Sequence, residues 1–352
     1  MNQFIPLTIK SIQPQTDQAI CIAFELTAEQ QNIFRYQPGQ HLTIRHLTTT
    51  GELRRCYSIC SDLQEDISIA IKQVDQGQFS TWANQHLKVG DCLEIMPPQG
   101  VFFQKARKQG GQHYLGFAAG SGITPILSII KSVLNQHSET TFTLVYGNRS
   151  WKQTMFAEQI MDLKDQYKSR LQLINIFSRE LNDQDIFNGR IDAEKLQQLF
   201  QANLIVPQID HVFACGPEEM MQAIEQVLPS LGVAKEKIHT ERFNRGSAAK
   251  TSAVPSQNRN EESVSIILDG RELQIDVSAQ DDSILDAALR AGADLPYACK
   301  GGVCATCKCK VLQGQVDMAV NYSLEEDEIA KGYVLSCQAR PLSSDVRLSF
   351  DQ

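Results

Sequence analysis

The most informative absence in this sequence is that of a long apolar run. Apolar residues make up 42% of the chain, but no uninterrupted stretch approaches the ~18 residues that a helix needs to cross a bilayer. Residues 1–10 also lack the basic stretch followed by an apolar stretch that marks a secretory signal. These absences predict a cytoplasmic protein that makes no contact with a membrane.

The sequence also lacks an excess of basic residues. It has 33 Lys and Arg against 41 Asp and Glu, and a net charge of −8. Because binding to nucleic-acid phosphates needs clustered Lys and Arg, we expect no nucleic-acid partner. The acidic excess lies at the C-terminal end, where Glu262–Gln352 contains 15 acidic and 8 basic residues. Such a surface is either simply solvated or a docking face for a basic partner.

Cysteine, in contrast, is abundant, with ten residues. A disulfide framework is not expected in a reducing cytosol. Five cysteines are dispersed in apolar contexts, where we expect them to pack as small hydrophobic side chains. The other five fall between Cys299 and Cys337, and this clustering indicates a chemical function. The dispersed cysteines are Cys21, Cys56, Cys60, Cys92 and Cys215.

The rhythm of apolar residues divides the chain into segments. Apolar residues at every second position up to about residue 104 predict a small antiparallel barrel. Strands then alternate with helices, which predicts a parallel α/β sheet. A polar stretch without apolar periodicity follows, and a β-hairpin and a short helix come after it. We therefore predict two domains at 1–108 and 109–243, a flexible linker at 244–261 and a third domain at 262–352.

The cysteine cluster has the spacing of a metal-binding loop. Cys299, Cys304 and Cys307 are followed thirty residues later by Cys337, which is the C-x4-C-x2-C…C spacing of plant-type [2Fe–2S] ferredoxins. We expect Gly301 and Gly302 to permit the unusual backbone angles that wrap such a cluster. Zinc is the competing metal, but its sites more often use paired C-x2-C motifs or histidine. The four cysteines therefore predict a β-grasp ferredoxin domain, in which Cys309 is a spare, structural cysteine.

The barrel segment contains the sequence Arg55-Cys56-Tyr57-Ser58. A guanidinium suits a pyrophosphate, an aromatic ring packs along an isoalloxazine or a ribityl chain, and a hydroxyl assists the arrival of a hydride. This R-x-Y-S pattern resembles the flavin-binding strand of the ferredoxin–NADP⁺ reductase superfamily. The resemblance implies that these four residues bind a flavin and that Ser58 is catalytic.

A second motif supports the flavin. The residues Gly77, Phe79, Ser80 and Thr81 resemble the second phosphate-binding turn of that superfamily, with a helix that starts near Ser80 and offers its N–H groups. Pro38–Gln40 and Pro98–Phe102 also occupy positions expected from the resemblance. FAD is favoured over FMN, although relatives use either.

A glycine-rich turn indicates the nicotinamide site. Gly120, Gly122, Thr124 and Pro125 follow an apolar strand and open a helix, with Pro125 where the Rossmann fingerprint has its third glycine. We expect Thr124 to cap this helix and Pro125 to take its first position. The turn resembles that of the same superfamily, and so does Cys215-Gly216-Pro217. The resemblance places Cys215 near the nicotinamide, as a catalytic residue, and Phe243 beside the flavin.

The choice of coenzyme depends on two strand ends. Arg149 lies at one, and Ser178 and Arg179 lie at the other. Neither spot has the acidic residue that binds a free ribose 2′-hydroxyl in many NAD-specific folds. Both arginines suit bidentate binding of a 2′-phosphate, and the alternative is that one or both are ordinary arginines of a solvated loop. We favour NADPH over NADH.

Together the motifs predict a relay. A nicotinamide delivers two electrons as a hydride, a [2Fe–2S] cluster carries one electron, and a flavin converts between the two. Nearly the whole chain resembles the reductase subunits of bacterial phenylacetyl-CoA 1,2-epoxidase complexes. The densest matches are Asp282–Lys310, Asn321–Leu324, Gly332–Gln338 and Arg54–Cys60.

The resemblance implies that electrons pass to a di-iron oxygenase in aerobic phenylacetate degradation. A reductase for another multicomponent oxygenase or for a hybrid-cluster protein is the main alternative. A self-contained oxidase or diaphorase would have no use for a cluster domain. A plain electron carrier would have no use for the flavin and nicotinamide motifs.

Overall fold

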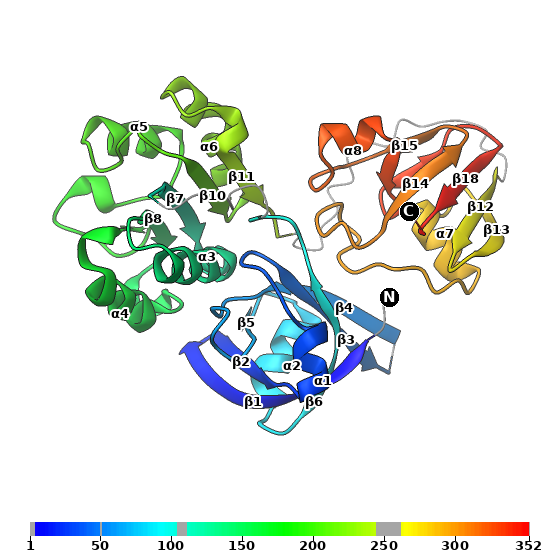
Figure 1. The fold of residues 1–352 in the computed structure, drawn as a ribbon, viewed down its shortest axis with the longest axis horizontal. Helices are drawn as coiled ribbons and strands as arrows, with labels where there is room; N and C mark the ends of the chain where they lie inside the picture. The colour runs from blue at the N-terminus through cyan, green and yellow to red at the C-terminus, as the bar shows by residue number, and fades with distance from the viewer. Residues whose placement is uncertain (1–3, 50, 104–110, 244–261, 352) are drawn as a thin grey trace. The chain divides into compact units, whose positions relative to one another are not determined.

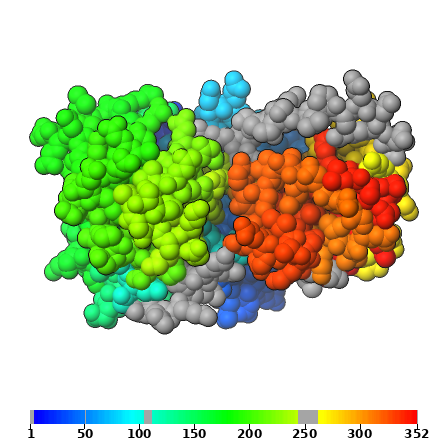
Figure 2. All heavy atoms as spheres, turned by 90° about the horizontal axis from the view of Figure 1, so that it is seen from above, coloured from blue at the N-terminus to red at the C-terminus, as the bar shows by residue number. Residues whose placement is uncertain are grey.

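The computed structural model describes residues 4–49, 51–103, 111–243 and 262–351. The chain divides into two compact units, residues 1–243 and 244–352 (Figure 1). The predicted linker at 244–261 and the predicted boundary between residues 108 and 109 lie outside the described residues. In Figure 2 the segments around α6 (Glu218–Ser230, yellow-green) and α8 (Glu326–Ala330, orange) lie at the surface of their respective units.

The first sheet is antiparallel, with the strand order β4-β3-β6-β1-β2-β5. A bridge between Ile59 and Ile69 brings its two edges together, as in a barrel. Inward-facing apolar residues such as Leu7, Ile22 and Ile44 are fully buried, because side chains alternate between the two faces of each strand. The elements are β1 (Ile5–Thr16), β2 (Ala19–Glu25), α1 (Ala28–Ile33), β3 (His41–Thr48), β4 (Gly51–Ser58), β5 (Ser68–Lys72), α2 (Gln78–His86) and β6 (Cys92–Gln99).

The second sheet is parallel, with the order β11-β10-β7-β8-β9. Residues of α3 and α4 pack in the core on one face, and residues of α5 and α6 pack in the core on the other (Figure 1). Both faces are covered, so the strands are continuously apolar. The elements are β7 (His113–Ala119), α3 (Ile123–Gln136), β8 (Thr141–Asn148), α4 (Ala157–Tyr167), β9 (Leu171–Phe177), α5 (Ala193–Gln201), β10 (His211–Cys215), α6 and β11 (Ile238–Glu241).

Helix α3 binds the barrel through its polar side chains. The Ser128 hydroxyl donates to the carbonyl oxygen of Ser61 at 2.7 Å, and the Ser132 hydroxyl donates to Asp62 Oδ1 at 2.9 Å. One turn away, Lys131 forms an ion pair with Glu65 at 2.7 Å. The loop after β4 therefore fixes the position of α3, and with it the parallel sheet, on the barrel within one compact unit.

The second unit contains a mixed five-stranded sheet with the order β13-β12-β18-β14-β16, in which β12 and β18 are parallel. Helix α7 packs on it and is capped by Ser283, whose hydroxyl accepts from the Asp286 N–H at 3.1 Å. This is a β-grasp arrangement, and the predicted three-part fold is confirmed. The elements are β12 (Glu262–Leu268), β13 (Arg271–Val277), α7 (Ile284–Arg290), β14 (Lys308–Gln313), β15 (Val316–Met318), α8, β16 (Tyr333–Leu335), β17 (Ala339–Pro341) and β18 (Val346–Ser349).

The expected cap of α3 is wrong. The helix begins at Ile123 after a short 3₁₀ turn, Gly120–Gly122, and its N-cap is Gly122. Thr124 is the second helical residue, and its hydroxyl donates to the carbonyl oxygen of Ser121 at 3.0 Å. Pro125 is third, a position that tolerates proline because the first-turn N–H groups have no partner within the helix. In the described part of the chain, no helix is both long and apolar enough to span a bilayer.

Candidate functional site

The barrel and the parallel sheet meet at two polar side chains. Ser58 ends β4, is 3% exposed, and donates through its hydroxyl to Glu241 Oε2 at 2.9 Å. Glu241 is the last residue of β11. The sequence predicted Ser58 as a site residue but missed Glu241. The available signal was a carboxylate at the carboxyl end of a parallel strand, which is where sites form in such sheets.

The charge of Glu241 is sensitive to its surroundings. Burial raises the pKa of this carboxyl to about 7, while the nearby His41 and the hydrogen bond from Ser58 act in the opposite direction. His41 faces Ser58 across the β3–β4 ladder and is 7% exposed. Gly100 adjoins it, and a Cβ there would lie only 3.1 Å from His41 Nδ1. A buried group that changes protonation near neutral pH is characteristic of a functional site.

Cys215 lies at the end of β10, fully buried. Burial, and then the negative charge of Glu241, raises the pKa of its thiol well above the ordinary value, so the thiol is neutral. A Cβ on Gly122 would overlap the carbonyl oxygen of Cys215, and a Cβ on Gly216 would lie 2.5 Å from Met220 Cε. The structure therefore brings the glycine-rich turn and the Cys215–Pro217 motif together, and Gly122 is needed for that approach because its neighbour is backbone, whereas the neighbour of Gly216 is the end of a flexible side chain.

Strand β4 presents its motif on two faces, because side chains alternate along a strand. Arg55 is exposed, and Tyr57 is half-buried with its ring 5.9 Å from that of Phe79. Burial raises the pKa of the Tyr57 hydroxyl, which is neutral. Cys56 points to the opposite face, where its sulfur lies 3.5 Å from Thr43 Oγ1. Arg55 and Tyr57 thus share one face, and Cys56 does not join them.

The turn before α2 is held by its own residues. Gly77 is the N-cap of the helix, and a Cβ there would overlap Ser80 Oγ. The Ser80 hydroxyl, 6% exposed, accepts from the Val74 N–H at 3.2 Å and contacts the carbonyl oxygen of Gly77 at 3.4 Å. The hydroxyl therefore stabilises the turn, while Thr81 lies in the first turn and is half-buried. The N-cap Gly77 supplies no side-chain cap, so the first N–H groups of the helix are the groups at this turn that suit an anion.

The ends of β8 and β9 lie side by side. The Ser178 N–H donates to the carbonyl oxygen of Asn148 at 3.0 Å, and the Arg179 N–H donates to that of Arg149 at 2.9 Å. Both guanidinium groups are exposed, and neither forms an ion pair with any residue that the structure describes. Glu180 follows, and its carboxylate accepts from the Trp151 N–H at 2.7 Å. Sequence reasoning overlooked this acidic residue, but a backbone N–H already engages it.

The four cysteines of the second unit lie in two pairs. A hydrogen bond with Cys304 raises the pKa of the Cys299 thiol, and one with Cys337 raises the pKa of the Cys307 thiol, so each thiol has one principal sulfur neighbour. Within the described ranges, no three His, Cys, Asp or Glu side chains converge as a site for a single ion. A two-iron cluster needs two pairs, since its four thiolates are shared between two irons. A structural zinc would need all four ligands around one point.

The cluster loop adopts unusual backbone angles. Gly302 has φ +75°, and a Cβ there would lie 2.9 Å from the carbonyl oxygen of Val320. Lys300 and Ala305 also have positive φ, each +54°, whereas Gly301 does not. The expectation for glycine therefore holds at Gly302 and is wrong at Gly301. The Gly301 N–H instead donates to Cys299 Sγ at 3.3 Å, a contact that stabilises negative charge on this sulfur.

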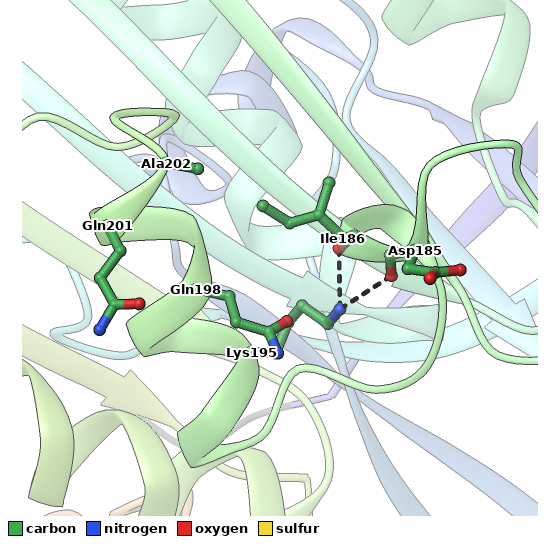
Figure 3. A pocket seen from close by; sticks show the side chains of 6 residues that line it. All are labelled: Asp185, Ile186, Lys195, Gln198, Gln201 and Ala202. Atoms are coloured by element: carbon green, nitrogen blue, oxygen red, sulfur yellow. Dashed lines mark hydrogen bonds between the residues drawn. The ribbon is translucent and has the colours of Figure 1, made fainter.

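Cys309 and Phe243 have contrasting positions. Cys309 is 1% exposed and packs in the core of the second unit, while Phe243 is the second residue after β11 and is 39% exposed. A shallow depression lies elsewhere in the first unit, beside α5 (Figure 3). Lys195 crosses it and donates to the carbonyl oxygens of Asp185 and Ile186 at 3.3 and 2.9 Å. No predicted site residue lines it, and we assign it no role.

Three family models match the chain in succession. The oxidoreductase FAD-binding domain matches residues 6–103, the oxidoreductase NAD-binding domain matches 117–226, and the 2Fe-2S iron-sulfur cluster binding domain matches 266–342. The fold and site therefore define a flavin-dependent oxidoreductase with its own iron–sulfur domain.

Similarity to whole proteins narrows this class. A subunit of 1,2-phenylacetyl-CoA epoxidase from Escherichia coli is 49% identical over 352 residues, covering 100% of this chain and 99% of that protein. The ferredoxin reductase component of 3-ketosteroid-9-alpha-monooxygenase from Rhodococcus rhodochrous is 32% identical over 359 residues, covering 99% and 97%. The chain belongs to the family of oxygenase-system reductases that includes both of these proteins.

Solved structures share the fold. Phthalate dioxygenase reductase matches with a TM-score of 0.60 at 23% identity, covering 99% of this chain and 98% of that chain. An intact type IV self-sufficient cytochrome P450 monooxygenase matches with a TM-score of 0.70 at 19% identity, covering 98% of this chain and 41% of that chain. At these identities the likeness concerns the fold alone.

Proposed function

We propose that this protein takes a hydride from NADPH and delivers single electrons to the di-iron oxygenase component of a phenylacetyl-CoA epoxidase. The observation that carries the proposal is the 49% identity to the phenylacetyl-CoA epoxidase protein of Escherichia coli, which extends over the whole chain.

The barrel has the features that an FAD needs. Arg55 offers an exposed guanidinium, Tyr57 and Phe79 form an aromatic wall, and Gly77 opens a helix whose N-terminus has no side-chain cap. A planar guanidinium and a helix N-terminus are both suited to a pyrophosphate. When bound, a flavin accepts two electrons as a hydride and gives them up singly, and a [2Fe–2S] cluster carries one at a time.

The protein's own contribution at this stage is the control of a proton. Ser58 holds its hydroxyl proton toward Glu241, and His41 lies on the same face of the β3–β4 ladder. Because the pKa of Glu241 is about 7, this carboxyl both accepts and releases a proton at neutral pH. Cys215, kept neutral by burial, adds a small apolar surface beside the carboxyl without adding charge.

NADPH is the coenzyme that the strand ends suit best. Arg149 and Arg179 are adjacent, exposed and without ion-pair partners within the described residues. A 2′-phosphate would supply the missing negative charge and bind guanidinium groups bidentately. Ser178 adds a hydroxyl at the same edge.

Coenzyme choice is tested by Arg179→Gln and Arg149→Gln. Each variant is expected to raise the KM for NADPH about tenfold or more, because a charge-assisted hydrogen bond is lost, and to leave the KM for NADH nearly unchanged. Lys152→Gln serves as the control, because that exposed lysine pairs with Asp17 and lies outside the strand-end pair. An equal loss for both coenzymes would contradict a 2′-phosphate site.

The second unit fits the cluster. Hydrogen bonds with the neighbouring thiols, and then burial, raise the pKa of Cys299 and of Cys307 when no metal compensates them. A coordinating metal deprotonates its thiols. The four thiolates would then repel one another, and the positive charge of the cluster irons would offset that repulsion. Cys299, Cys304, Cys307 and Cys337 would hold the cluster, with N–H donors from the loop directed at the sulfurs.

The partner is tested by turnover with purified oxygenase component. NADPH oxidation is expected to require both the oxygenase and phenylacetyl-CoA, and to produce epoxide in proportion. Before that, the visible spectrum of the protein should show flavin bands and a ferredoxin-type envelope, both bleached by NADPH. The epoxidase would be rejected as the acceptor by two results together. NADPH would bleach the visible spectrum without turnover of phenylacetyl-CoA, and NADPH oxidation would be coupled instead to another oxygenase or to a hybrid-cluster protein.

A further inference from the structure

A glutamine side chain reaches the cluster loop from the segment that carries the fourth cysteine of the proposed cluster site. Gln338 directly follows Cys337. Its backbone is anchored on both sides, because its N–H donates to the carbonyl oxygen of Leu335 at 2.9 Å and its carbonyl oxygen accepts from the Ala319 N–H at 3.0 Å. The direction in which the side chain leaves the backbone is therefore restricted, and the amide has a defined position beside the loop.

The amide nitrogen of Gln338 has three acceptors within reach. Nε2 lies 3.0 Å from the carbonyl oxygen of Lys300, 2.9 Å from that of Cys337, and 3.7 Å from Cys337 Sγ. Carbonyl oxygens only accept, so the group that faces them is the NH₂ end of the amide and not its oxygen. This group has two protons for three acceptors. One proton serves Lys300, and the other is shared between the oxygen and the sulfur of Cys337.

The bond to Lys300 ties together two segments that are 38 residues apart in sequence. Lys300 follows the first cysteine of the loop and has φ +54°, a left-handed conformation that a lysine keeps only where its surroundings enforce it. Gln338 also lies close to Gly302, where a Cβ would be 3.2 Å from Gln338 Cγ. The stem and the amide of this one side chain therefore contact the loop at two of its unusual backbone positions.

We propose that Gln338 is a positioning residue of the iron–sulfur site, and that its amide raises the reduction potential of the cluster. This inference rests on the proposed function in that Cys337, 6% exposed, is one of the four residues that would hold the cluster. An N–H group directed at a ligating sulfur stabilises negative charge there, and a cluster carries more negative charge once it has accepted an electron. The amide therefore favours the reduced state, as hydrogen bonds to cluster sulfurs do in general.

The consequence concerns the step from flavin to cluster. A higher cluster potential favours transfer of a single electron from the reduced flavin, so Gln338 would help to set the direction of the relay. The same contacts also describe a simpler role, in which the amide binds only the two carbonyl oxygens and holds the loop closed. That simpler role leaves the potential unchanged, so a measured potential separates the two.

The test is a reductive titration of the purified, cofactor-loaded protein with dithionite and redox dyes. The reduced cluster is followed by its electron paramagnetic resonance signal, which separates it from the flavin. Gln338→Met keeps an unbranched stem beside Gly302 and removes both N–H donors. Gln338→Glu keeps the shape of the side chain and replaces the donors with a carboxylate. We expect the midpoint potential to fall in Gln338→Met and to fall further in Gln338→Glu, which adds a negative charge.

Gln313→Met is the matched control. Gln313 is an exposed residue of the same unit, and its Nε2 donates to Asp345 Oδ2 at 3.2 Å. Its potential should equal that of the wild type. Iron should pass to a chelator several-fold faster from both Gln338 variants than from this control, because both variants lose the bond to the carbonyl oxygen of Lys300.

Two results would overturn the proposal. One is a midpoint potential in Gln338→Met equal to that of the control, and faster loss of iron with this unchanged potential would leave Gln338 only the simpler role. The other is a potential in Gln338→Glu at or above that of Gln338→Met. The titration uses neither NADPH nor an oxygenase, so errors in the coenzyme or the acceptor do not affect it. A wild-type protein without the ferredoxin-type envelope would instead reject the cluster itself.

Discussion

At the scale of single residues, the Glu241 carboxyl changes its charge near neutral pH, with a pKa of about 7. It is protonated below that pH and ionised above it. The Ser58 hydroxyl therefore donates to a neutral carboxyl at lower pH and to a carboxylate at higher pH. A single side chain thus couples the barrel to the parallel sheet and gives the site a titration of its own.

The first prediction concerns this titration. Flavin reduction by NADPH, followed by stopped-flow absorbance, should show a transition near pH 7 that Glu241→Gln removes. His41→Gln should move the transition to higher pH, because the histidine lowers the pKa of Glu241. The infrared band of the protonated Glu241 carboxyl, identified by its absence in Glu241→Gln, should titrate with the same midpoint pH. In His41→Gln that midpoint should also move to higher pH, which tests the assignment without turnover.

His46→Gln is the matched control, since His46 lies on the same strand but stacks on Trp82 at 3.9 Å. A transition near pH 7 that persists in Glu241→Gln would assign the titration to another group.

The second prediction separates two neighbouring glycines of the cluster loop. Gly302→Ala should lower the iron content and the ferredoxin-type absorbance severalfold, because its φ of +75° strains an alanine and its Cβ would press on Val320. Gly301→Ala, at a residue without positive φ, should keep far more of the cluster. Equal loss in both variants would show that backbone angle is not the reason for the glycines.

At the scale of elements, α7 shows how a helix end is fixed by charge. Arg290, its last residue, donates to Asp281 Oδ1 at 2.9 Å and to Asp281 Oδ2 at 2.7 Å, and also to the carbonyl oxygen of Asp276 at 2.7 Å. Asp281 is 8% exposed and also accepts from the Ser278 N–H at 2.8 Å. These bonds hold the pKa of Asp281 well below its ordinary value.

The third prediction follows with a definite sign. A carboxyl whose folded pKa is depressed stabilises the fold above its unfolded pKa of about 4, and this contribution is lost as the pH falls further. Arg290→Gln should therefore cost about 1 kcal/mol at pH 7, discounted because Arg290 is half exposed. The difference from the wild type, measured by thermal unfolding of the second unit, should shrink below about pH 4. If the stability difference between Arg290→Gln and the wild type were the same at every pH, the Arg290–Asp281 contact would contribute through packing and not through charge.

The elements also show the reach of sequence reasoning. The barrel strands, the alternating helices and the hairpin of the second unit were predicted, because side-chain periodicity and turn residues act locally. The start of α3 was not, because the 3₁₀ turn at Gly120–Gly122 advances the helix to Ile123. Close approach of Gly122 to Cys215 requires that turn, and no local pattern contains the partner.

At the scale of the whole molecule, the two units have separate cores. The cores of residues 1–243 contain no described residue of the second unit, whose own core surrounds Cys307 and Cys337. Loss of the cluster should therefore leave the flavin half of the proposed relay intact.

The fourth prediction tests that division. Cys337→Ser should lose the ferredoxin-type absorbance and nearly all oxygenase-coupled turnover, while NADPH-dependent reduction of ferricyanide falls less than about twofold. Cys309→Ser, at a buried cysteine outside the two thiol pairs, is the comparison and should keep its cluster. Parallel loss of both activities in Cys337→Ser would mean that the cluster domain is needed for flavin reduction itself.

The sequence by itself determined the cysteine spacing, the glycine-rich turns and the order of the three domains, because each depends on residues close together in the chain. Only the tertiary structure decided which residues complete the site. Ser58 and Glu241 are 183 residues apart in sequence, and the Cys21–Cys60 contact spans 39. Contacts of this kind arise where strands of different segments pack against one another, and side-chain periodicity gives the face of a residue but not its distant neighbour.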